Sequence, residues 1–135
     1  MEDREDGLDR RITQLRKGIL ELAVMAVLYR GRQYGYSLVR VLAEHSGASL
    51  NGASLKEGTV YPILARLDRE GTVRSEWVES GQGPPRKYYA LTPAGRRLFT
   101  ELSQELDRLV SLVKQDWGLP DEPEAAGTQL FVRRK

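Results

Sequence analysis

The hydrophobic pattern of this chain changes its period near Gly71, and this change restricts the folds that the chain can adopt. Before the glycine, Val60, Leu64 and Leu67 recur at the spacing of one face of a helix. After it, residues 73–80 alternate between two sets of side chains, which is the pattern of a strand. Because glycine readily adopts the backbone angles that end a helix, the sequence predicts a helix that stops at Gly71 and a strand directly after it.

The predicted helix has an apolar side and a side suited to close contact. Ser54 and Glu57 have the spacing of a capping box, which satisfies backbone N–H groups at a helix start. The side opposite the apolar stripe consists of Gly58, Pro62, Ala65 and Arg69, flanked by Thr59, Tyr61 and Arg66. Such a side can lie close against another rigid surface, although an ordinary surface helix with a buried stripe has the same pattern. The interior proline also predicts a kink or a tightened first turn, because proline lacks the N–H that a helix interior uses.

A β-hairpin is predicted after this helix. Residues 86–92 form its second strand, and the segment 81–85, Gly-Gln-Gly-Pro-Pro, lies between the two strands. Glycine supplies unusual backbone angles and proline cannot continue a strand ladder, so this segment favours a turn. Arg86 and Lys87 place two cations where the chain leaves the turn. We expect Trp77 to lie in the core of the hairpin rather than to form a platform for a ligand.

Two helices are predicted before this unit. A helical pattern begins at Ile12 and ends at Gly31, after a charged segment, residues 1–11, that we expect to be flexible. Residues 36–46 form a second helix, and residues 46–55 have the small polar composition of a loop. Helix, helix, loop, helix is the order of a helix-turn-helix motif with a support helix, and a hairpin directly after it is a wing. The predicted fold class is therefore mainly α with a small β-hairpin: a winged helix-turn-helix at residues 12–92, followed by a C-terminal helix.

This fold and the distribution of charge favour DNA as a partner. In a winged helix the third helix enters the major groove, and the wing lies along the backbone or in the minor groove. Residues 56–97 carry eight Lys or Arg and five Asp or Glu, a net charge of +3. Residues 98–126 carry two and seven, a net charge of −5. A basic part followed by an acidic part suggests a polyanionic partner, although chance patchiness gives differences of this size.

Two apolar seams predict contact between two copies of the chain. Thr92 and Pro93 are favoured residues for the N-cap and the first position of a last helix, expected over residues 93–117. Spacings of three and four residues place one seam on the first helix and one on the last. The predicted interface residues are Ile12, Leu15, Ile19, Leu22, Leu102, Leu106, Leu109, Val113 and Trp117. Because the first helix has a second apolar face at Leu20 and Val24, it needs both a domain core and another surface to cover it.

Composition argues against several other classes of protein. The chain has 135 residues, enough for one domain, and no cysteine, so no disulfide framework is expected. It has no apolar run of bilayer length and no signal-peptide core at its start, so we expect a cytoplasmic protein without membrane contact. One histidine, His45, and no recognisable phosphate loop, metal-ligand cluster or nucleophile–base pair argue against an enzyme, a cofactor or a metal site. Residues 118–135 are expected to form a flexible tail.

Four segments of the sequence resemble the PadR-like transcriptional regulators. They are Tyr34-Gly-Tyr-Ser-Leu38, Glu57-Gly-Thr-Val-Tyr-Pro62, Leu64-x-x-Leu67-x-x-x-Gly71 and Arg86-Lys-Tyr-Tyr-x-Leu-Thr92. The match extends from about Leu15 to Trp117, and the second and fourth segments together form a specific signature. The resemblance is to the small subfamily with a single C-terminal helix. It implies a homodimeric repressor that binds an inverted-repeat operator in double-stranded DNA, with the first and last helices in the dimer interface. Some members bind aromatic or multidrug-like ligands, which adds a small hydrophobic or aromatic effector as a candidate partner.

Eight residues are predicted to contact DNA, because helix starts and exposed cations favour phosphate. They are Tyr36, Ser37, Lys56, Thr59, Tyr61, Arg66, Arg86 and Lys87. Three alternatives stay open at this point: the ring of Tyr61 packs on the wing, the wing cations form a merely solvated turn, or Arg69 forms a surface salt bridge. A further alternative is that the winged helix docks on a protein partner. Salt-dependent affinity for duplex DNA would separate that alternative from a DNA-binding protein.

Overall fold

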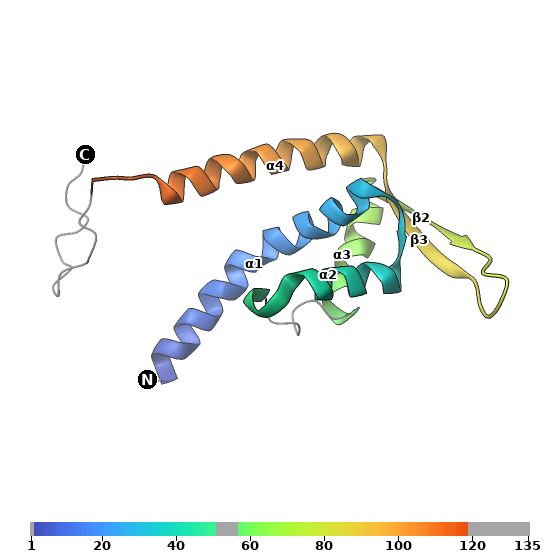
Figure 1. Ribbon diagram of the computed structural model, residues 1–135, viewed down its shortest axis with the longest axis horizontal. Helices are drawn as coiled ribbons and strands as arrows, with labels where there is room; N and C mark the ends of the chain where they lie inside the picture. The colour runs from blue at the N-terminus through green and yellow to red at the C-terminus, as the bar shows by residue number, and fades with distance from the viewer. Residues whose placement is uncertain (1, 51–56, 119–135) are drawn as a thin grey trace. The chain divides into compact units, whose positions relative to one another are not determined.

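The computed structural model describes residues 2–50 and 57–118 (Figure 1). The described residues up to Ser103 form a helical domain with a small antiparallel sheet. The element order is α1 (Glu2–Arg30), β1 (Gln33–Tyr34), α2 (Gly35–Leu50), α3 (Glu57–Arg69), β2 (Val73–Val78), β3 (Arg86–Leu91) and α4 (Pro93–Lys114). This order confirms the predicted winged helix-turn-helix with a C-terminal helix. The described chain divides between Ser103 and Gln104 into two compact units. No helix in the described segments is both long and apolar enough to cross a membrane.

One hydrophobic core joins α1, α2, α3 and the sheet. The buried apolar side chains are Leu20, Val24, Met25, Leu28, Leu38, Val39, Leu42, Val60, Ile63, Leu64, Leu67, Val73, Tyr89 and Leu91. The helical spacing of Val60, Leu64 and Leu67 therefore identified the buried side of α3 correctly. Burial of such side chains stabilises the domain by roughly 1.5–3 kcal/mol each relative to exposure, so this stripe determines which way α3 faces.

The sheet has the strand order β1-β3-β2, and both pairs are antiparallel. Val73 pairs with Leu91 at one end of the hairpin and Val78 with Arg86 at the other. Successive side chains of a strand point to opposite faces, so the register assigns each residue to one side. The inner face, which contributes to the core, carries Val73, Ser75, Trp77, Lys87, Tyr89 and Leu91; the outer face carries Tyr34, Arg74, Glu76, Val78, Arg86, Tyr88 and Ala90. Figure 1 shows that the hairpin extends beyond the helices as a two-stranded ribbon.

Three boundaries differ from the prediction. α1 begins at Glu2 rather than at Ile12, because the charged start contains no helix-breaking proline and its acidic residues suit the positive end of a helix dipole. α2 continues to Leu50, through residues whose small polar composition predicted a loop from residue 46. α4 ends at Lys114 rather than at residue 117, so Trp117 follows the helix instead of belonging to it. Between the first two helices, Gln33–Tyr34 forms the edge strand β1. The remaining loop residues, with Ser54, and the tail after Gly118 lie outside the described residues.

The junction between the sheet and α4 confirms the predicted N-cap. The backbone N–H of Gly95 donates to Thr92 Oγ1 at 3.0 Å, and Thr92 Oγ1 lies 2.7 Å from the carbonyl oxygen of Gly71. The N–H of Thr92 also donates to the carbonyl of Thr72 at 3.0 Å. A Cβ on Gly95 would collide with that same carbonyl, so only glycine allows α4 to start this close to the end of α3.

Candidate nucleic-acid interface

The exposed side of α3 is the side that the sequence predicts. Gly58, Tyr61, Pro62, Ala65 and Arg69 are exposed, whereas the residues between them are buried or half-buried. No long side chain occupies the centre of this surface. A rigid partner can therefore approach the helix backbone closely.

A groove of about 340 Å³ lies between this side of α3 and the inner face of the hairpin. Its walls are Tyr61, Ala65, Asp68, Arg69, Lys87 and Tyr89. Two cations therefore border the groove, one from the helix and one from the wing. Asp68, the acidic residue in the wall, accepts a hydrogen bond of 2.9 Å from Ser75 Oγ on β2. This bond ties α3 to the hairpin and reduces the repulsion that the carboxylate would exert on an anion.

Tyr61 has a structural contact as well as an exposed edge. A Cβ on Gly35 would lie 2.6 Å from Cε1 and 2.7 Å from the hydroxyl of Tyr61, so the ring packs directly over the backbone at the start of α2. Glycine at position 35 is therefore required by the ring rather than by backbone angles. Burial raises the pKa of the neighbouring Tyr89 phenol, and Tyr61 and Asp68 raise it further, so Tyr89 stays neutral and apolar in behaviour near neutral pH.

The two wing cations point to opposite faces of the hairpin. The Lys87 ammonium lies on the inner face, 5.5 Å from the ring centroid of Trp77 and 5.9 Å from that of Tyr89. The Arg86 guanidinium lies on the outer face, 4.6 Å from the ring centroid of Tyr34. Both separations are within the range of cation–π attraction. The alternative of a merely solvated turn does not account for these contacts, which hold both cations beside aromatic rings. Contact of Arg86 and Lys87 with DNA stays a prediction.

Trp77 does not lie in a wing core, contrary to the prediction. Its side chain is 68% exposed, although it belongs to the inner face. The reason is that the core ends at Tyr89, whose partner in the register is the half-buried Ser75, and Trp77 lies one inner-face position further toward the turn. The exposed ring of Trp77 lies beside Lys87 on the inner face of the hairpin. Trp77 is therefore a candidate DNA contact, which strand alternation alone did not identify.

The turn of the hairpin is held by one hydroxyl. Ser80 Oγ lies 2.6, 3.3 and 3.0 Å from the carbonyl oxygens of Gln82, Gly83 and Pro84. Gly81 and Gly83 have φ values of 80° and 83°, a region that favours glycine. This local network gives the tip a defined conformation, so the strands that carry the wing cations are held in register.

The predicted contacts at the start of α2 differ in their availability. Tyr36 is exposed, and the Arg40 guanidinium lies 5.9 Å from its ring centroid. Ser37 Oγ lies 2.7 Å from Gln33 Oε1 and 3.0 Å from the carbonyl oxygen of Tyr34, so its hydroxyl is engaged within the chain. Contact of Ser37 with DNA stays a prediction and would require this hydroxyl to exchange its partner.

Three other predicted contacts lie apart from the groove or outside the description. Arg66 forms an ion pair of 3.2 Å with Glu21 on α1, so its guanidinium is directed toward the support helix. Thr59 is half-buried on the flank of α3, and Lys56 lies outside the described residues. Arg69, by contrast, has no ion pair with any residue that the structure describes, so the alternative of a surface salt bridge finds no support.

The predicted interface residues differ along the two seams. On α1, Leu15 is 72% exposed, while Ile12, Ile19 and Leu22 are half-buried. Near the C-terminal end of α1, the apolar surface has a partner within the chain, because the ring of Tyr29 lies 4.9 Å from the ring of Phe99 on α4. These side chains leave an apolar strip on α1 that the domain core does not use.

The seam of α4 is also exposed within the unit that begins at Gln104. On α4, Leu109 and Val113 are exposed, Val113 to 74%. Trp117 is exposed as well, but it lies beyond the end of α4 at Lys114. Leu106 is half-buried. The adjacent Leu112 and Val110 are exposed as well, which makes the apolar face of the helix broad. Leu102, in the other unit, continues the same seam by sequence and is 38% exposed.

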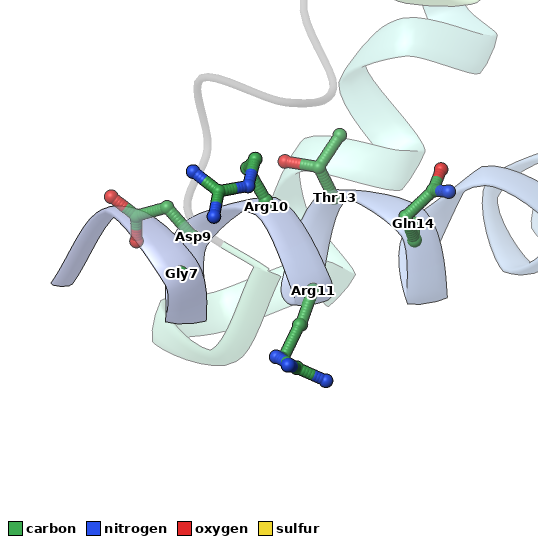
Figure 2. A pocket seen from close by; sticks show the side chains of 6 residues that line it. All are labelled: Gly7, Asp9, Arg10, Arg11, Thr13 and Gln14. Atoms are coloured by element: carbon green, nitrogen blue, oxygen red, sulfur yellow. The ribbon is translucent and has the colours of Figure 1, made fainter. Parts of the chain in front are cut away.

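A separate hollow of about 570 Å³ lies along the first part of α1 (Figure 2). Its described lining is Gly7, Asp9, Arg10, Arg11, Thr13 and Gln14, all from this one helix. Figure 2 shows that Arg11 points away from the side on which Arg10 and Thr13 lie. Residues from a single helix do not enclose a ligand, so we assign no binding site here.

Three helices around a small core and a hairpin beside the third helix define a winged helix-turn-helix domain, the class that transcriptional regulators use to bind DNA. The sequence profile of the transcriptional regulator PadR-like family matches residues 24–101. This chain belongs to the PadR-like family, and it is therefore a DNA-binding transcriptional regulator rather than an enzyme.

Solved structures of other family members have the same fold. A PadR family transcriptional regulator from Eggerthella lenta is 34% identical, with a TM-score of 0.63, over 81% of this chain and 87% of that one. A PadR-like transcriptional regulator from Bacillus cereus is 31% identical, also with a TM-score of 0.63, over 74% of this chain and 92% of that one.

A relative found by sequence is the transcriptional regulator Rv3488 from Mycobacterium tuberculosis. It is 39% identical over 61 residues, which are 45% of this chain and 56% of that protein.

Proposed function

We propose that this chain is a homodimeric repressor that acts in the cytoplasm and binds an inverted-repeat operator in double-stranded DNA. The observation that carries the proposal is the groove between α3 and the wing, with its open helix face and its bordering cations Arg69 and Lys87. A helix face without long side chains can enter a major groove closely, and the two cations are available to the phosphates on either side.

The exposed face of α3 also suggests how operators are distinguished. Direct recognition of bases depends mainly on Arg–guanine pairs and Asn or Gln–adenine pairs. The leading end of α3 offers Gly58, Thr59 and Tyr61 instead. We therefore expect DNA shape and a few contacts to share the specificity, so that base changes are costly at only a few positions of each half-site.

The apolar seams support a second copy as partner. Exposed side chains such as Leu15, Leu109 and Val113 would lose contact with water in a dimer, at about 25 cal/mol per Å² of apolar surface. A two-fold dimer would place its two α3 helices about 34–36 Å apart, one turn of DNA. A small hydrophobic or aromatic effector would bind to the same apolar face, near Trp117, and release the DNA by changing the spacing of the two α3 helices.

Selection of duplexes from a random DNA pool at near-physiological salt tests the proposal. An enriched inverted repeat, bound by two subunits in sedimentation experiments, is the expected result. Enrichment of a single, non-repeated site would contradict a symmetric dimer. No enrichment and no salt-dependent affinity for any duplex, with the protein folded, would overturn the DNA-binding role and favour docking on a protein partner.

A further inference from the structure

The outer face of the sheet carries a cluster of arginines that the groove beside α3 does not use. Arg74 and Arg86 belong to this face by the strand register. Arg32, just before β1, joins them, because its guanidinium lies 4.6 Å from the ring centroid of Tyr88. Glu76, the carboxylate in this cluster, is 3.2 Å from Arg32. Glu79 lines a hollow together with Arg86 and Tyr88, so the three arginines exceed the two carboxylates by one.

Aromatic rings hold two of these cations, Arg32 and Arg86, in place. The rings of Tyr34 and Tyr88 are 5.6 Å apart, and each supports one guanidinium on its face. These contacts stack four side chains in one row across β1 and β3, which we call the column: Arg32, Tyr88, Tyr34 and Arg86. A long arginine side chain loses conformational freedom when it binds a phosphate, and a ring that already restrains it reduces that loss.

We infer that the outer face is a second phosphate-binding surface, which binds the DNA backbone on the side of the wing that faces away from α3. This inference rests on the proposed contact between the wing and DNA. Arg86 and Lys87 are neighbours in one strand but point to opposite faces, so a wing laid on DNA presents cations to both sides of the ribbon. Lys87 serves the side that borders α3, and Arg86, with Arg74 and Arg32, serves the other.

Duplex DNA is the occupant that fits these observations. The column is continuous with the wing that borders α3, so one ligand can touch both faces of the ribbon. Two hollows border this face in the described part of the chain. One of about 40 Å³ is lined by Arg32, Arg74, Ser75, Glu76, Tyr88, Tyr89 and Ala90, and one of about 370 Å³ is lined by Val78, Glu79, Ser80, Gln82, Arg86 and Tyr88. Most of these side chains are charged or polar, so the face suits a charged backbone better than a small apolar ligand.

Salt-dependent binding of a fluorescent random-sequence duplex of about 30 base pairs tests the inference, because phosphate contacts do not depend on sequence. The test protein is the full chain with Arg74→Gln and Arg86→Gln. Affinity falls as salt rises, and each lost phosphate contact should make the slope of log affinity against log salt shallower by about 0.9. For each lost contact, the factor by which a fourfold rise in salt weakens binding should therefore be about 3.5-fold smaller than in the unchanged protein. Arg32→Gln alone should have a smaller effect, since Glu76 already neutralises part of its charge.

Two further variants serve as references. Arg11→Gln removes one positive charge, half of what the outer-face variant removes, from α1. Arg11 lies 19 residues before Arg30 and so about 28 Å away along the helix axis, and its substitution should leave the slope unchanged. Lys87→Gln should reduce the slope through the inner face. If Lys87→Gln has this effect and the outer-face variant equals Arg11→Gln, the inference is wrong and the proposed function stands. If the unchanged protein shows no salt-dependent binding, the proposed function fails, and the inference fails with it.

Tyr34 is a positioning residue in this inference. Its ring holds the guanidinium of Arg86, but its side chain carries no positive charge that would itself bind a phosphate. Tyr34→Phe keeps the ring and should bind the duplex as the unchanged protein does. Tyr34→Leu removes the ring and should lower affinity only while Arg86 is present. An equal loss in the Arg86→Gln background would show that Tyr34 merely supports the fold.

Discussion

The most sharply defined perturbation is the removal of one hydroxyl, in Thr92→Ala. This hydroxyl accepts a hydrogen bond from the N–H of Gly95 at 3.0 Å and lies 2.7 Å from the carbonyl oxygen of Gly71. The first contact caps α4, and the second links the start of α4 to the end of α3. The hydroxyl also lies 3.1 Å from the carbonyl oxygen of Thr72, which shares its proton with the carbonyl of Gly71. The substitution leaves the backbone bond from the N–H of Thr92 to Thr72 in place, so its effect isolates the side chain.

The two lost contacts determine the expected magnitude. Loss of an N-cap hydroxyl costs about 0.5–2 kcal/mol, and loss of a net hydrogen bond costs about 0.5–1.5 kcal/mol. The free energy of unfolding should therefore fall by about 1–3.5 kcal/mol. Thr92→Ser keeps the hydroxyl and loses only a methyl group, so it should cost about 1 kcal/mol or less.

Urea unfolding at one fixed protein concentration measures both variants, since dimerisation would make stability depend on concentration. The midpoint should fall for Thr92→Ala while the slope of free energy against urea stays constant. Two results would refute the reasoning: an alanine variant within about 0.5 kcal/mol of the unchanged protein, or a serine variant as unstable as the alanine variant.

Three further predictions follow from the described contacts. Leu106→Glu should give monomers in sedimentation, because a charge would enter the apolar seam of the dimer; a fully dimeric variant would place the interface elsewhere. In Trp117→Phe, Trp77 is the remaining tryptophan, and its emission should change when duplex DNA is added; constant emission would separate Trp77 from the DNA surface. Glu21→Gln frees the guanidinium of Arg66 and should raise duplex affinity at low salt, whereas unchanged affinity would argue against a DNA contact by Arg66.

Local patterns in the sequence were sufficient for the class of fold. The change of period at Gly71, the cap at Thr92 and the apolar spacing of α3 each depend on residues close together in the chain. The structure confirms all three. Strand alternation also contains the information that Arg86 and Lys87 face opposite ways, because neighbouring side chains of any strand do so.

The surroundings of individual side chains could not be obtained in this way. Trp77 has the same strand parity as buried Val73, yet it is exposed because the core ends before it. Arg66 has the helical position of a possible phosphate contact, yet Glu21 lies within 3.2 Å of it across a different helix. Such contacts join residues distant in sequence, and local propensity does not encode which of them meet. Periodicity is a property of a short segment. Exposure, ion pairing and the cation–π contacts of Arg86 and Lys87 depend instead on how the segments pack in three dimensions.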